Sequence, residues 1–379
     1  MTGVPLPDGT VSPGPHVVVA GGHSAGHIEP TMNFADALKR LEPTAEITAL
    51  GTVRGLDTTL IPARGYPLEL IPPVPLQRKV NRALFSTPAR LRASVRAAGE
   101  VLDRVGAEVV VGFGGYVAVP AYLAARRREL PIVVHEANAR PGVANRMAAR
   151  MTTHVFTASA GVRLAHGTPI GIPLRPAIAD LDRTALRAAA RERFGLEPDG
   201  PVLMVTGGSQ GARAINWAVS GAAEAIRRAG VQVLHITGPA NVVDLPDGLG
   251  SPAYVVVPFV EEMQYAYAAA DFVVCRSGAM TCAELSAVGL PAVYVPLPLR
   301  GGEQRLNAEA IAAAGGAVIV DNDEFTPAWV EANLLPIITD PVQVARMSAA
   351  ASRAGARDAD VVLARHVLRV IAEHRRFAA

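Results

Sequence analysis

Three glycine-rich turns constrain this chain more than any other feature of its sequence. They read GGHSAGH at residues 21–27, GGSQGAR at 207–213 and SGAMTCAE at 277–284, and each follows an apolar run with the composition of a buried strand. A turn of this kind that leads into a helix leaves backbone N–H groups unpaired, and such groups bind phosphates. Three of them together favour a sugar nucleotide as ligand, and the wide separation of the first two predicts two Rossmann-like halves.

Chain length and hydrophobic pattern predict an α/β protein of two domains. A chain of 379 residues exceeds one ordinary core. Short apolar runs alternate with alanine-rich helical stretches, which is typical of doubly wound parallel sheets covered by helices. The strand-like runs lie at 16–20, 46–50, 108–112, 131–135, 153–157, 201–206, 231–237, 253–257, 271–275, 292–296 and 317–320.

A stretch rich in proline and glycine at 167–176 can continue neither a helix nor a strand, so we place an interdomain linker there. We expect the two sheets to face one interdomain cleft and the final helix to return to the first domain. The predicted organisation is a disordered lead-in over 1–14, an N-terminal domain over 15–166, the linker over 167–176, a C-terminal domain over 177–357 and a terminal helix over 358–379.

Composition argues against several classes of protein. The formal net charge is only +2 and aromatic residues make up 5% of the chain, so nothing indicates nucleic-acid binding. No segment has the apolar length of a membrane span or a signal peptide, so we expect a cytoplasmic protein that is at most peripheral to a membrane. Cys275 and Cys282 have no second Cys/His pair nearby, so we expect buried, reduced thiols and no metal site.

The first turn carries the residue that we favour as a general base. His27 falls near the first turn of a predicted helix, where the helix dipole disfavours an extra positive charge and keeps the imidazole neutral. A neutral imidazole can accept the proton of an incoming hydroxyl group. The alternative is that His27 only caps the turn, and His23 in the same loop is the second choice for the base.

The other two turns supply candidate groups for a nucleotide. The second turn lacks both the Lys-Ser/Thr of a P-loop and the GxGxxG spacing of a dinucleotide site. Ser209 and the backbone N–H groups after it nevertheless suit a pyrophosphate. The alternative is a plain tight turn with no ligand. In the third, Glu284 shares a helix face with Thr281, where a carboxylate either accepts both ribose hydroxyls or serves as an ordinary cap. Arg276 is the orienting cation there, and the amide-bearing run at 303–307 suits the hydroxyls of a sugar.

Six motifs, taken in order, resemble the MurG family of peptidoglycan glycosyltransferases, which is glycosyltransferase family 28. The motifs are GGHSAGHIEP, VGFGGYVAVP, HEANARPGVANR, TGGSQGARAIN, CRSGAMTCAEL and GEQRLNA, and they run from about His16 to past Asn307, over most of the chain. The last motif and the composition rich in arginine and alanine are similar to the actinobacterial branch of the family.

The resemblance implies a GT-B fold and an inverting transfer of N-acetylglucosamine. The donor is UDP-GlcNAc, the acceptor is the C4 hydroxyl of the muramyl sugar in lipid I, the product is lipid II, and neither a metal nor another cofactor is expected. His27 as base and Glu284 at the ribose are the catalytic pair that the family pattern implies. The implied donor-binding residues are Arg175, Gly208, Ser209, Gln210, Phe259, Val260, Arg276, Ala279, Met280, Thr281, Glu284, Glu303, Gln304 and Asn307. The implied acceptor-binding residues are Ser24, Ala25, Gly26, His27, Gly114, Gly115, Tyr116, Glu136, Asn138 and Asn145.

The family resemblance also implies a surface in the first domain that meets the cytoplasmic face of the plasma membrane. Residues 76–104 hold seven basic and two acidic side chains with apolar residues between them, which suits anionic lipid headgroups. The alternative is a solvated helix face above a core stripe. The membrane-contacting residues that we expect are Arg78, Lys79, Arg82, Leu84 and Phe85. Proteins of cell-wall assembly and division are further expected partners, and nucleic acid is not.

Two departures from the family pattern leave the acceptor open. His23-Ser24 stands where a small Gly-Thr is expected, and Arg300-Gly301-Gly302 precedes Glu303 where relatives have a sequence closer to Gly-Asn-Gly. The alternatives are therefore a GT-B enzyme that uses UDP-GlcNAc on another acceptor, such as a natural product, or a UDP-GlcNAc epimerase. A non-catalytic scaffold of cell-wall assembly is a third alternative, although the chain keeps His27, Glu284 and Gln304.

Overall fold

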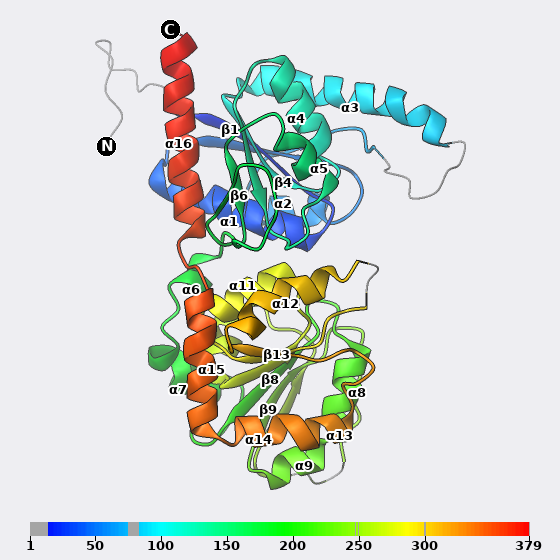
Figure 1. The fold of residues 1–379 in the computed structure, drawn as a ribbon, viewed down its shortest axis with the longest axis vertical. Helices are drawn as coiled ribbons and strands as arrows, with labels where there is room; N and C mark the ends of the chain where they lie inside the picture. The colour runs from blue at the N-terminus through cyan, green and yellow to red at the C-terminus, as the bar shows by residue number, and fades with distance from the viewer. Residues whose placement is uncertain (1–13, 75–82, 247, 249, 299–300, 379) are drawn as a thin grey trace. The chain divides into compact units, whose positions relative to one another are not determined.

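The computed structural model describes residues 14–74, 83–246, 248, 250–298 and 301–378. The chain divides into two compact units (Figure 1). Unit 1 consists of Met1–Leu174 together with Asp358–Ala379, and unit 2 is the intervening Arg175–Arg357. Each unit is built on one parallel sheet, so the α/β class expected from the alternating pattern is confirmed.

Unit 1 contains a seven-stranded sheet with the order β3-β2-β1-β4-β5-β6-β7. The order reverses between β1 and β4, and open α/β sheets bind ligands beyond the carboxyl ends of the strands at such a reversal. The strands are β1 His16–Gly21, β2 Glu46–Gly51, β3 Leu68–Leu70, β4 Val109–Gly114, β5 Ile132–Glu136, β6 Val155–Thr157 and β7 Gly167–Pro169. The helices are α1 Ala25–Leu41, α2 Asp57–Ala63, α3 Ala83–Val105, α4 Ala118–Arg127, α5 Val143–Ala148 and α16 Ala359–Ala378.

Strand β1 is apolar along its whole length because both of its faces are covered by helices. Val17 and Val19 lie in a core cluster with side chains of α1 and α16. Val18 and Ala20 lie in a second cluster with side chains of α3 and α4. Successive side chains of a strand point to opposite faces of the sheet, so this two-sided burial explains the uninterrupted apolar run in the sequence.

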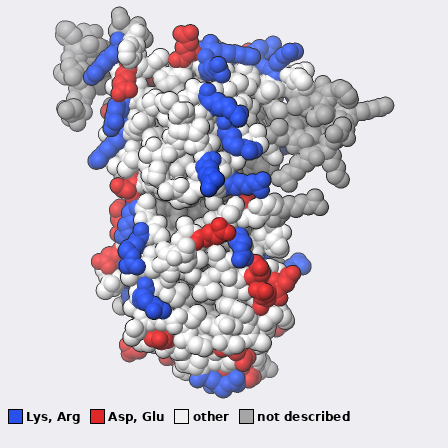
Figure 2. All heavy atoms as spheres, viewed as in Figure 1, with Lys and Arg blue, Asp and Glu red and all other residues white. Residues whose placement is uncertain are grey.

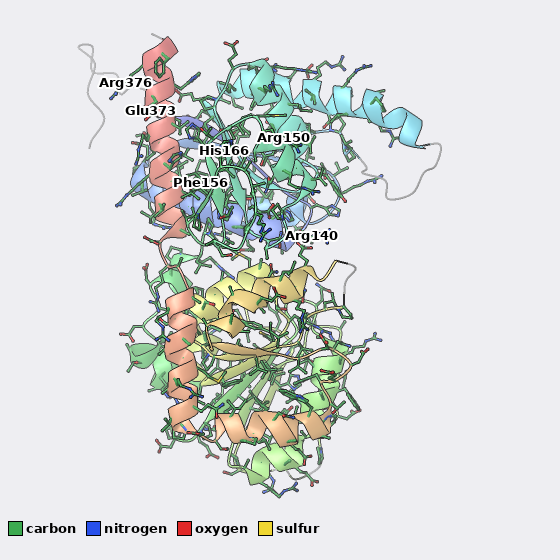
Figure 3. The ribbon with its side chains drawn as sticks, viewed as in Figure 1. Arg140, Arg150, Phe156, His166, Glu373 and Arg376 are labelled. Atoms are coloured by element: carbon green, nitrogen blue, oxygen red, sulfur yellow. The ribbon has the colours of Figure 1, made fainter. Side chains whose placement is uncertain are left out.

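The C-terminal helix α16 is part of unit 1. Its side chains Leu363 and Val367 are fully buried in the cluster that also contains α1. Arg40 Nη2 of α1 donates a hydrogen bond to Asp360 Oδ2 at 2.6 Å. Phe156 of β6, labelled in Figure 3, packs edge-on against the ring of His366 with 4.7 Å between the ring centroids. These contacts fasten the end of the chain to the first sheet.

Unit 2 contains a six-stranded parallel sheet with the order β10-β9-β8-β11-β12-β13, which reverses between β8 and β11. The strands are β8 Val202–Thr206, β9 Gln232–Ile236, β10 Tyr254–Val257, β11 Phe272–Cys275, β12 Ala292–Tyr294 and β13 Ala317–Ile319. The helices are α6 Pro176–Ala179, α7 Arg183–Arg193, α8 Arg213–Gly221, α9 Ala223–Arg228, α10 Met263–Ala269, α11 Ala279–Ala287, α12 Glu303–Ala313, α13 Pro327–Trp329, the π-helix η1 Val330–Leu334, α14 Leu335–Ile338 and α15 Pro341–Ala354.

Every strand run expected from the sequence overlaps an observed strand, and two observed strands were not expected. These are β3 and β7, each three residues long and each at an edge of the first sheet. Strand β7 lies inside 167–176, where a linker was expected, and the division between the units falls after Leu174. An edge strand tolerates Pro169 because no neighbouring strand on its outer side needs a backbone N–H from that residue.

Candidate active site

Two glycine turns of unit 1 pack backbone against backbone at the carboxyl ends of β1 and β4. A side chain at Gly21 would overlap Thr31 Oγ1, since a Cβ there would lie only 2.1 Å from that oxygen. Gly115 has φ +78°, and a Cβ on it would lie 2.8 Å from the carbonyl oxygen of Gly22. Only glycine allows this approach, so both turns are brought to the point where the strand order reverses.

His27 lies in the first turn of α1, facing the turn at Gly114 and Gly115 that follows β4. Its Nδ1 lies 3.2 Å from Ser24 Oγ, and a Cβ on Gly114 would lie 3.3 Å from its Nε2. Burial lowers the pKa of His27 below the ordinary 6.5, and the neighbouring His23 lowers it further. With its proton on Nδ1, the neutral ring keeps a lone pair on Nε2, as a general base requires.

A buried carboxylate supports this loop cluster from behind. Glu136, at the end of β5, is 2% exposed, and burial raises its pKa. Its Oε1 accepts a hydrogen bond from the Asn138 backbone N–H at 2.9 Å, and its Oε2 accepts one from Asn145 Nδ2 at 3.0 Å. The side-chain oxygen of Asn145 accepts from the Tyr122 hydroxyl at 2.9 Å. Glu136 and Asn145 therefore hold the loop that follows β5 from inside the unit.

Asp57 holds the first turn and was not expected from the sequence. It is fully buried, its Oδ2 accepts from the Thr52 backbone N–H at 2.8 Å, and its Oδ1 accepts from the His23 backbone N–H at 2.5 Å. His23 takes φ +78°, an uncommon conformation for a residue with a side chain. A hollow of about 200 Å³ opens here, lined by His23, Asp57, Arg54 and Tyr116 among others. Tyr116 is 40% exposed, with its ring centroid 6.0 Å from that of His23.

In unit 2, the second turn joins β8 to α8. Gly211 has φ +73°, and a Cβ on it would lie 1.9 Å from the carbonyl oxygen of Thr237. Asn241 Nδ2 donates to the backbone oxygen of Gln210 at 3.0 Å, so the turn is held while the side chains of Ser209 and Gln210 remain exposed. The turn thus presents Gly208, Ser209 and Gln210 at the edge where a diphosphate was expected.

The third turn joins β11, which pairs with β8, to α11. Gly278 caps α11, and no side-chain hydrogen bond caps the helix within the residues that the structure describes. The first backbone hydrogen bond into this turn comes from Cys282 N to Gly278 O at 2.9 Å. The half-buried Ala279, Met280 and Thr281 therefore present the N–H groups of a helix N-terminus, which attract phosphate.

Glu284 lies on the next turn of α11 and is only 8% exposed. The hydroxyl of Tyr267, which is 2% exposed, donates to Glu284 Oε2 at 2.6 Å. The sequence offered no reason to single out Tyr267, because it lies on another helix, α10. A buried carboxylate with a fixed orientation suits a ligand that presents two neighbouring hydroxyl groups.

Three other expected donor residues brace the loops around α11. Arg276 Nη1 donates to the Val295 carbonyl oxygen at 2.9 Å, and burial lowers the pKa of this guanidinium. Asn307 Nδ2 donates to the Ser277 carbonyl oxygen at 3.2 Å. Gln304 Oε1 accepts from the Leu297 backbone N–H at 2.9 Å. Glu303 begins α12 beside them.

The remaining predicted residues fall in different surroundings. Phe259 is 53% exposed after β10, with Val260 beside it. Arg175 precedes α6, and its Nε is buried without a hydrogen-bond partner among the described residues. Arg78, Lys79 and Arg82 lie outside the described residues, as do the side chains of Leu84 and Phe85, whose backbones belong to α3.

Cys275 and Cys282 are free and buried, as expected, and burial raises the pKa of Cys282 to about 12. Among the residues that the structure places, no group of three His, Cys, Asp or Glu side chains could hold a metal ion. In the same part of the chain, no helix is both long and apolar enough to cross a membrane.

A separate hollow of about 550 Å³ lies at the amino end of β5, away from the glycine turns. It is lined by Arg126, Arg150, His154 and His166 among others, and Figure 3 labels Arg150 and His166. None of the residues expected at the donor or the acceptor reaches it.

Two sequence families match the chain, one for each half. The Glycosyltransferase family 28 N-terminal domain matches residues 17–157, and the Glycosyltransferase family 28 C-terminal domain matches residues 202–363. A UDP-N-acetylglucosamine–N-acetylmuramyl-(pentapeptide) pyrophosphoryl-undecaprenol N-acetylglucosamine transferase of Rhodococcus opacus is 56% identical over 370 residues, covering 95% of this chain and 97% of its own. A protein of the same name from Streptomyces avermitilis is 54% identical over 365 residues, covering 95% of this chain and 100% of its own.

Solved structures agree with these matches. The crystal structure of Acinetobacter baumannii MurG is similar with a TM-score of 0.76 at 26% identity, over 95% of this chain and 100% of that one. The glycosyltransferase of kitacinnamycin is similar with a TM-score of 0.65 at 15% identity, over 95% of this chain and 100% of that one. The second likeness reflects the shared fold alone.

Proposed function

Because the chain belongs to glycosyltransferase family 28 and has its GT-B fold, we propose that it transfers N-acetylglucosamine from UDP-GlcNAc to the muramyl sugar of lipid I. The product is lipid II, a precursor of peptidoglycan. The observation that carries the proposal is the identity of 56% and 54%, each over 95% of the chain, with two proteins named for this transfer. The glycosyltransferase of kitacinnamycin is only 15% identical to this chain, so its likeness gives no support for a natural product as the acceptor.

On the acceptor side, we propose His27 as the general base. Its Nε2 takes the proton of the C4 hydroxyl of the muramyl sugar while that oxygen bonds to the anomeric carbon of N-acetylglucosamine. The lowered pKa of His27 keeps the ring neutral at pH 7, which suits this role. Tyr116 is exposed and Asn138, in the loop after β5, is half-buried, so both side chains could contact a sugar.

On the donor side, we propose that UDP leaves against backbone donors of unit 2. The bond from the anomeric carbon to the diphosphate breaks, and negative charge grows on the departing UDP. The first-turn N–H groups of α11 and the turn at Gly208 and Ser209 face that charge, and fixed donors of this kind stabilise it without a resident metal ion. Glu284 accepts the ribose hydroxyls, and Gln304 and Glu303 read those of the transferred sugar.

The assay for this function is UDP release from UDP-GlcNAc, measured with and without a water-soluble lipid I analogue. We expect release only when the analogue is present, and we expect EDTA to leave the rate unchanged. Release of UDP without any acceptor would mean hydrolysis of UDP-GlcNAc. Release only with sugar acceptors unrelated to lipid I would refute lipid I as the acceptor. A rate abolished by EDTA and restored by a divalent cation would refute the metal-free part.

We further propose that an anionic membrane surface is a partner of unit 1. Arg90, Arg92 and Arg96 are exposed along α3, and basic side chains predominate over acidic ones on the visible face of this unit (Figure 2). Each basic group near anionic lipid contributes about 1 kcal/mol, and the attraction weakens as salt rises. This supports a peripheral protein at the cytoplasmic face of the plasma membrane.

The test is co-sedimentation with anionic vesicles at low salt. Arg78→Glu combined with Arg82→Glu should abolish it while turnover of a short-chain, water-soluble acceptor is kept. Arg227→Glu with Arg228→Glu in unit 2 is the matched control and should still bind. Binding that persists in the first double variant, or that never depended on anionic lipid, would contradict the proposal.

A further inference from the structure

Glu284, the carboxylate that the proposed function assigns to the ribose, does not stand alone. The Tyr267 hydroxyl donates to its Oε2 at 2.6 Å, and the two side chains are 2% and 8% exposed. A phenol buried to this extent needs a hydrogen-bond acceptor, and an ionised carboxylate is the strongest one available in a protein. The contact therefore links α10 to the donor helix α11 through one short hydrogen bond.

Burial raises the pKa of Tyr267 well above its ordinary value, and the nearby Glu284 raises it further. The hydroxyl consequently keeps its proton at pH 7 and serves there as a hydrogen-bond donor. A carboxylate that accepts this bond cannot rotate freely about its last torsion. Its orientation is therefore set before any nucleotide arrives, which lowers the entropy that binding would otherwise lose.

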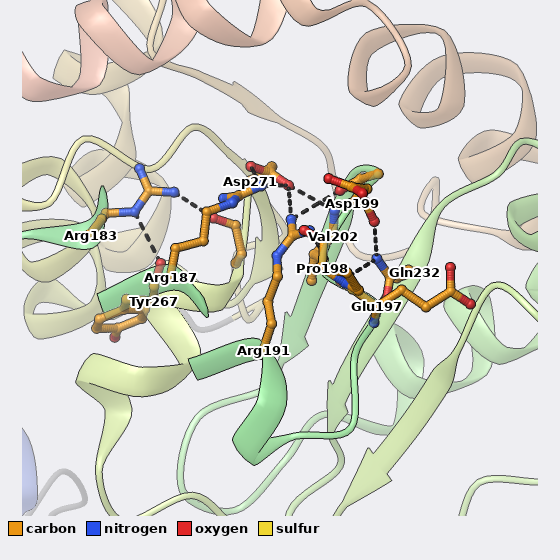
Figure 4. A network of polar contacts seen from close by, with 12 residues as sticks. Arg183, Arg187, Arg191, Glu197, Pro198, Asp199, Val202, Gln232, Tyr267 and Asp271 are labelled. Carbon is orange, nitrogen blue, oxygen red and sulfur yellow. Dashed lines mark hydrogen bonds and ion pairs between the residues drawn. The ribbon is translucent and has the colours of Figure 1, made fainter. Parts of the chain in front are cut away.

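The position of Tyr267 is itself fixed from α7, as Figure 4 shows. Arg183 Nε donates to the Tyr267 carbonyl oxygen at 3.0 Å, and Arg183 Nη2 donates to the carbonyl oxygen of Ala270. The next residue, Asp271, accepts from Arg191 Nη2 at 3.0 Å and from the Val202 backbone N–H at 2.9 Å. One guanidinium thus holds the C-terminal end of α10, and a second holds the strand that follows it.

From this geometry we propose that Tyr267 is a positioning residue for ribose recognition. Its hydroxyl orients the Glu284 carboxylate toward the two ribose hydroxyls, and Arg183 holds Tyr267 in place. The inference rests on the proposed function, since it takes the donor to be a uridine ribonucleotide. It adds two residues that touch no substrate and that lie outside all three glycine turns.

The experiment compares calorimetric binding of UDP and of 2′-deoxy-UDP to the full chain. The wild type should prefer UDP. Tyr267→Phe deletes one oxygen atom. It should reduce the ratio of UDP affinity to 2′-deoxy-UDP affinity about tenfold, the size expected when a hydrogen bond to a charged group is lost. With UDP-GlcNAc as substrate, KM should rise by a similar factor while kcat stays within about twofold, because the bond orients the ribose and not the reacting carbon.

Tyr254→Phe is the matched control. The Tyr254 hydroxyl lies 2.9 Å from His235 Nδ1, on strand β10 of the same unit, so this variant loses a part-buried hydroxyl contact without touching Glu284. It should keep the wild-type preference for UDP. Arg183→Lys is the second test variant, because it retains the charge but loses the planar fork, and it should narrow the preference in the same direction.

A folded Tyr267→Phe with the wild-type ratio of UDP to 2′-deoxy-UDP affinity would overturn the inference. If Tyr267→Phe does not fold, an unchanged ratio in Arg183→Lys would overturn it instead. Failure of the proposed function looks different: the wild type would then release no UDP with the lipid I analogue, whatever the nucleotide affinities are. Equal loss of preference in Tyr254→Phe would show a general effect on the unit and would also refute the specific role.

Discussion

Replacing His27 with alanine removes the imidazole that lies beside Gly114 in unit 1. The ring is half-buried, and the nearest polar contact of its Nδ1 is Ser24 Oγ at 3.2 Å. Its Nε2 lies close to Gly114, where a Cβ would come within 3.3 Å of it. The variant therefore loses the proposed base, and water can fill the space of the deleted ring.

The expected loss in kcat is roughly 10²–10⁴, the usual contribution of a positioned general base. This corresponds to about 3–5 kcal/mol of transition-state stabilisation. An ordinary histidine is about three quarters neutral at pH 7, and the lowered pKa of His27 increases that fraction. In the wild type, kcat/KM should fall as pH drops through a pKa below 6.5, because protonation of Nε2 removes the lone pair.

Stopped or continuous UDP-release assays with the lipid I analogue measure both effects, and calorimetry checks that UDP affinity is unchanged. His374→Ala on α16 is the matched control, because this side chain lies near Glu108 at the amino end of β4. It should keep wild-type turnover. Wild-type turnover in His27→Ala, or a rate that does not fall below pH 6.5, would refute the assignment of the base.

Two further predictions concern the donor site and stability. Glu284→Ala should weaken UDP binding by roughly 2–3 kcal/mol, as expected for the loss of a charged acceptor, and unchanged affinity in calorimetry would remove Glu284 from the site. Burial lowers the pKa of His235 to about 4, so between pH 6.5 and 4 this side chain takes up a proton only in the unfolded state. This histidine should therefore cost about 3 kcal/mol of stability as pH falls through that window. Urea unfolding should show a shallower pH dependence in His235→Gln, and an identical slope would contradict the argument.

The central strands were predictable because buried parallel strands are apolar on both faces and appear as short continuous runs. Strands such as β1 and β8 show this directly. The edge strands β3 and β7 have three residues each, and β7 contains both a glycine and a proline. Neither sequence therefore shows an apolar run long enough to be told apart from a loop. Their pairing depends on neighbours that only the folded sheet supplies.

The positions of residues in the glycine turns were also predictable, since a short motif places His27 in the first turn of α1 and Glu284 one turn into α11 by spacing alone. The supporting residues were not. Asp57 holds the turn at His23 across 34 residues of sequence, and Tyr267 reaches Glu284 across 17. Asp57 reaches this loop from α2, and Tyr267 reaches α11 from α10. No local pattern distinguishes these two residues from an ordinary helix start or a core aromatic.

The anomeric configuration of the product tests the central claim most directly. The donor carries its sugar through an α linkage, and a single displacement by the acceptor hydroxyl with His27 as base must invert that carbon. The coupling between H1 and H2 of the transferred N-acetylglucosamine, measured by NMR on the purified product, should be the large value of a β linkage to C4 of the muramyl sugar. A small coupling, which indicates an α linkage, or attachment at another position would contradict the account.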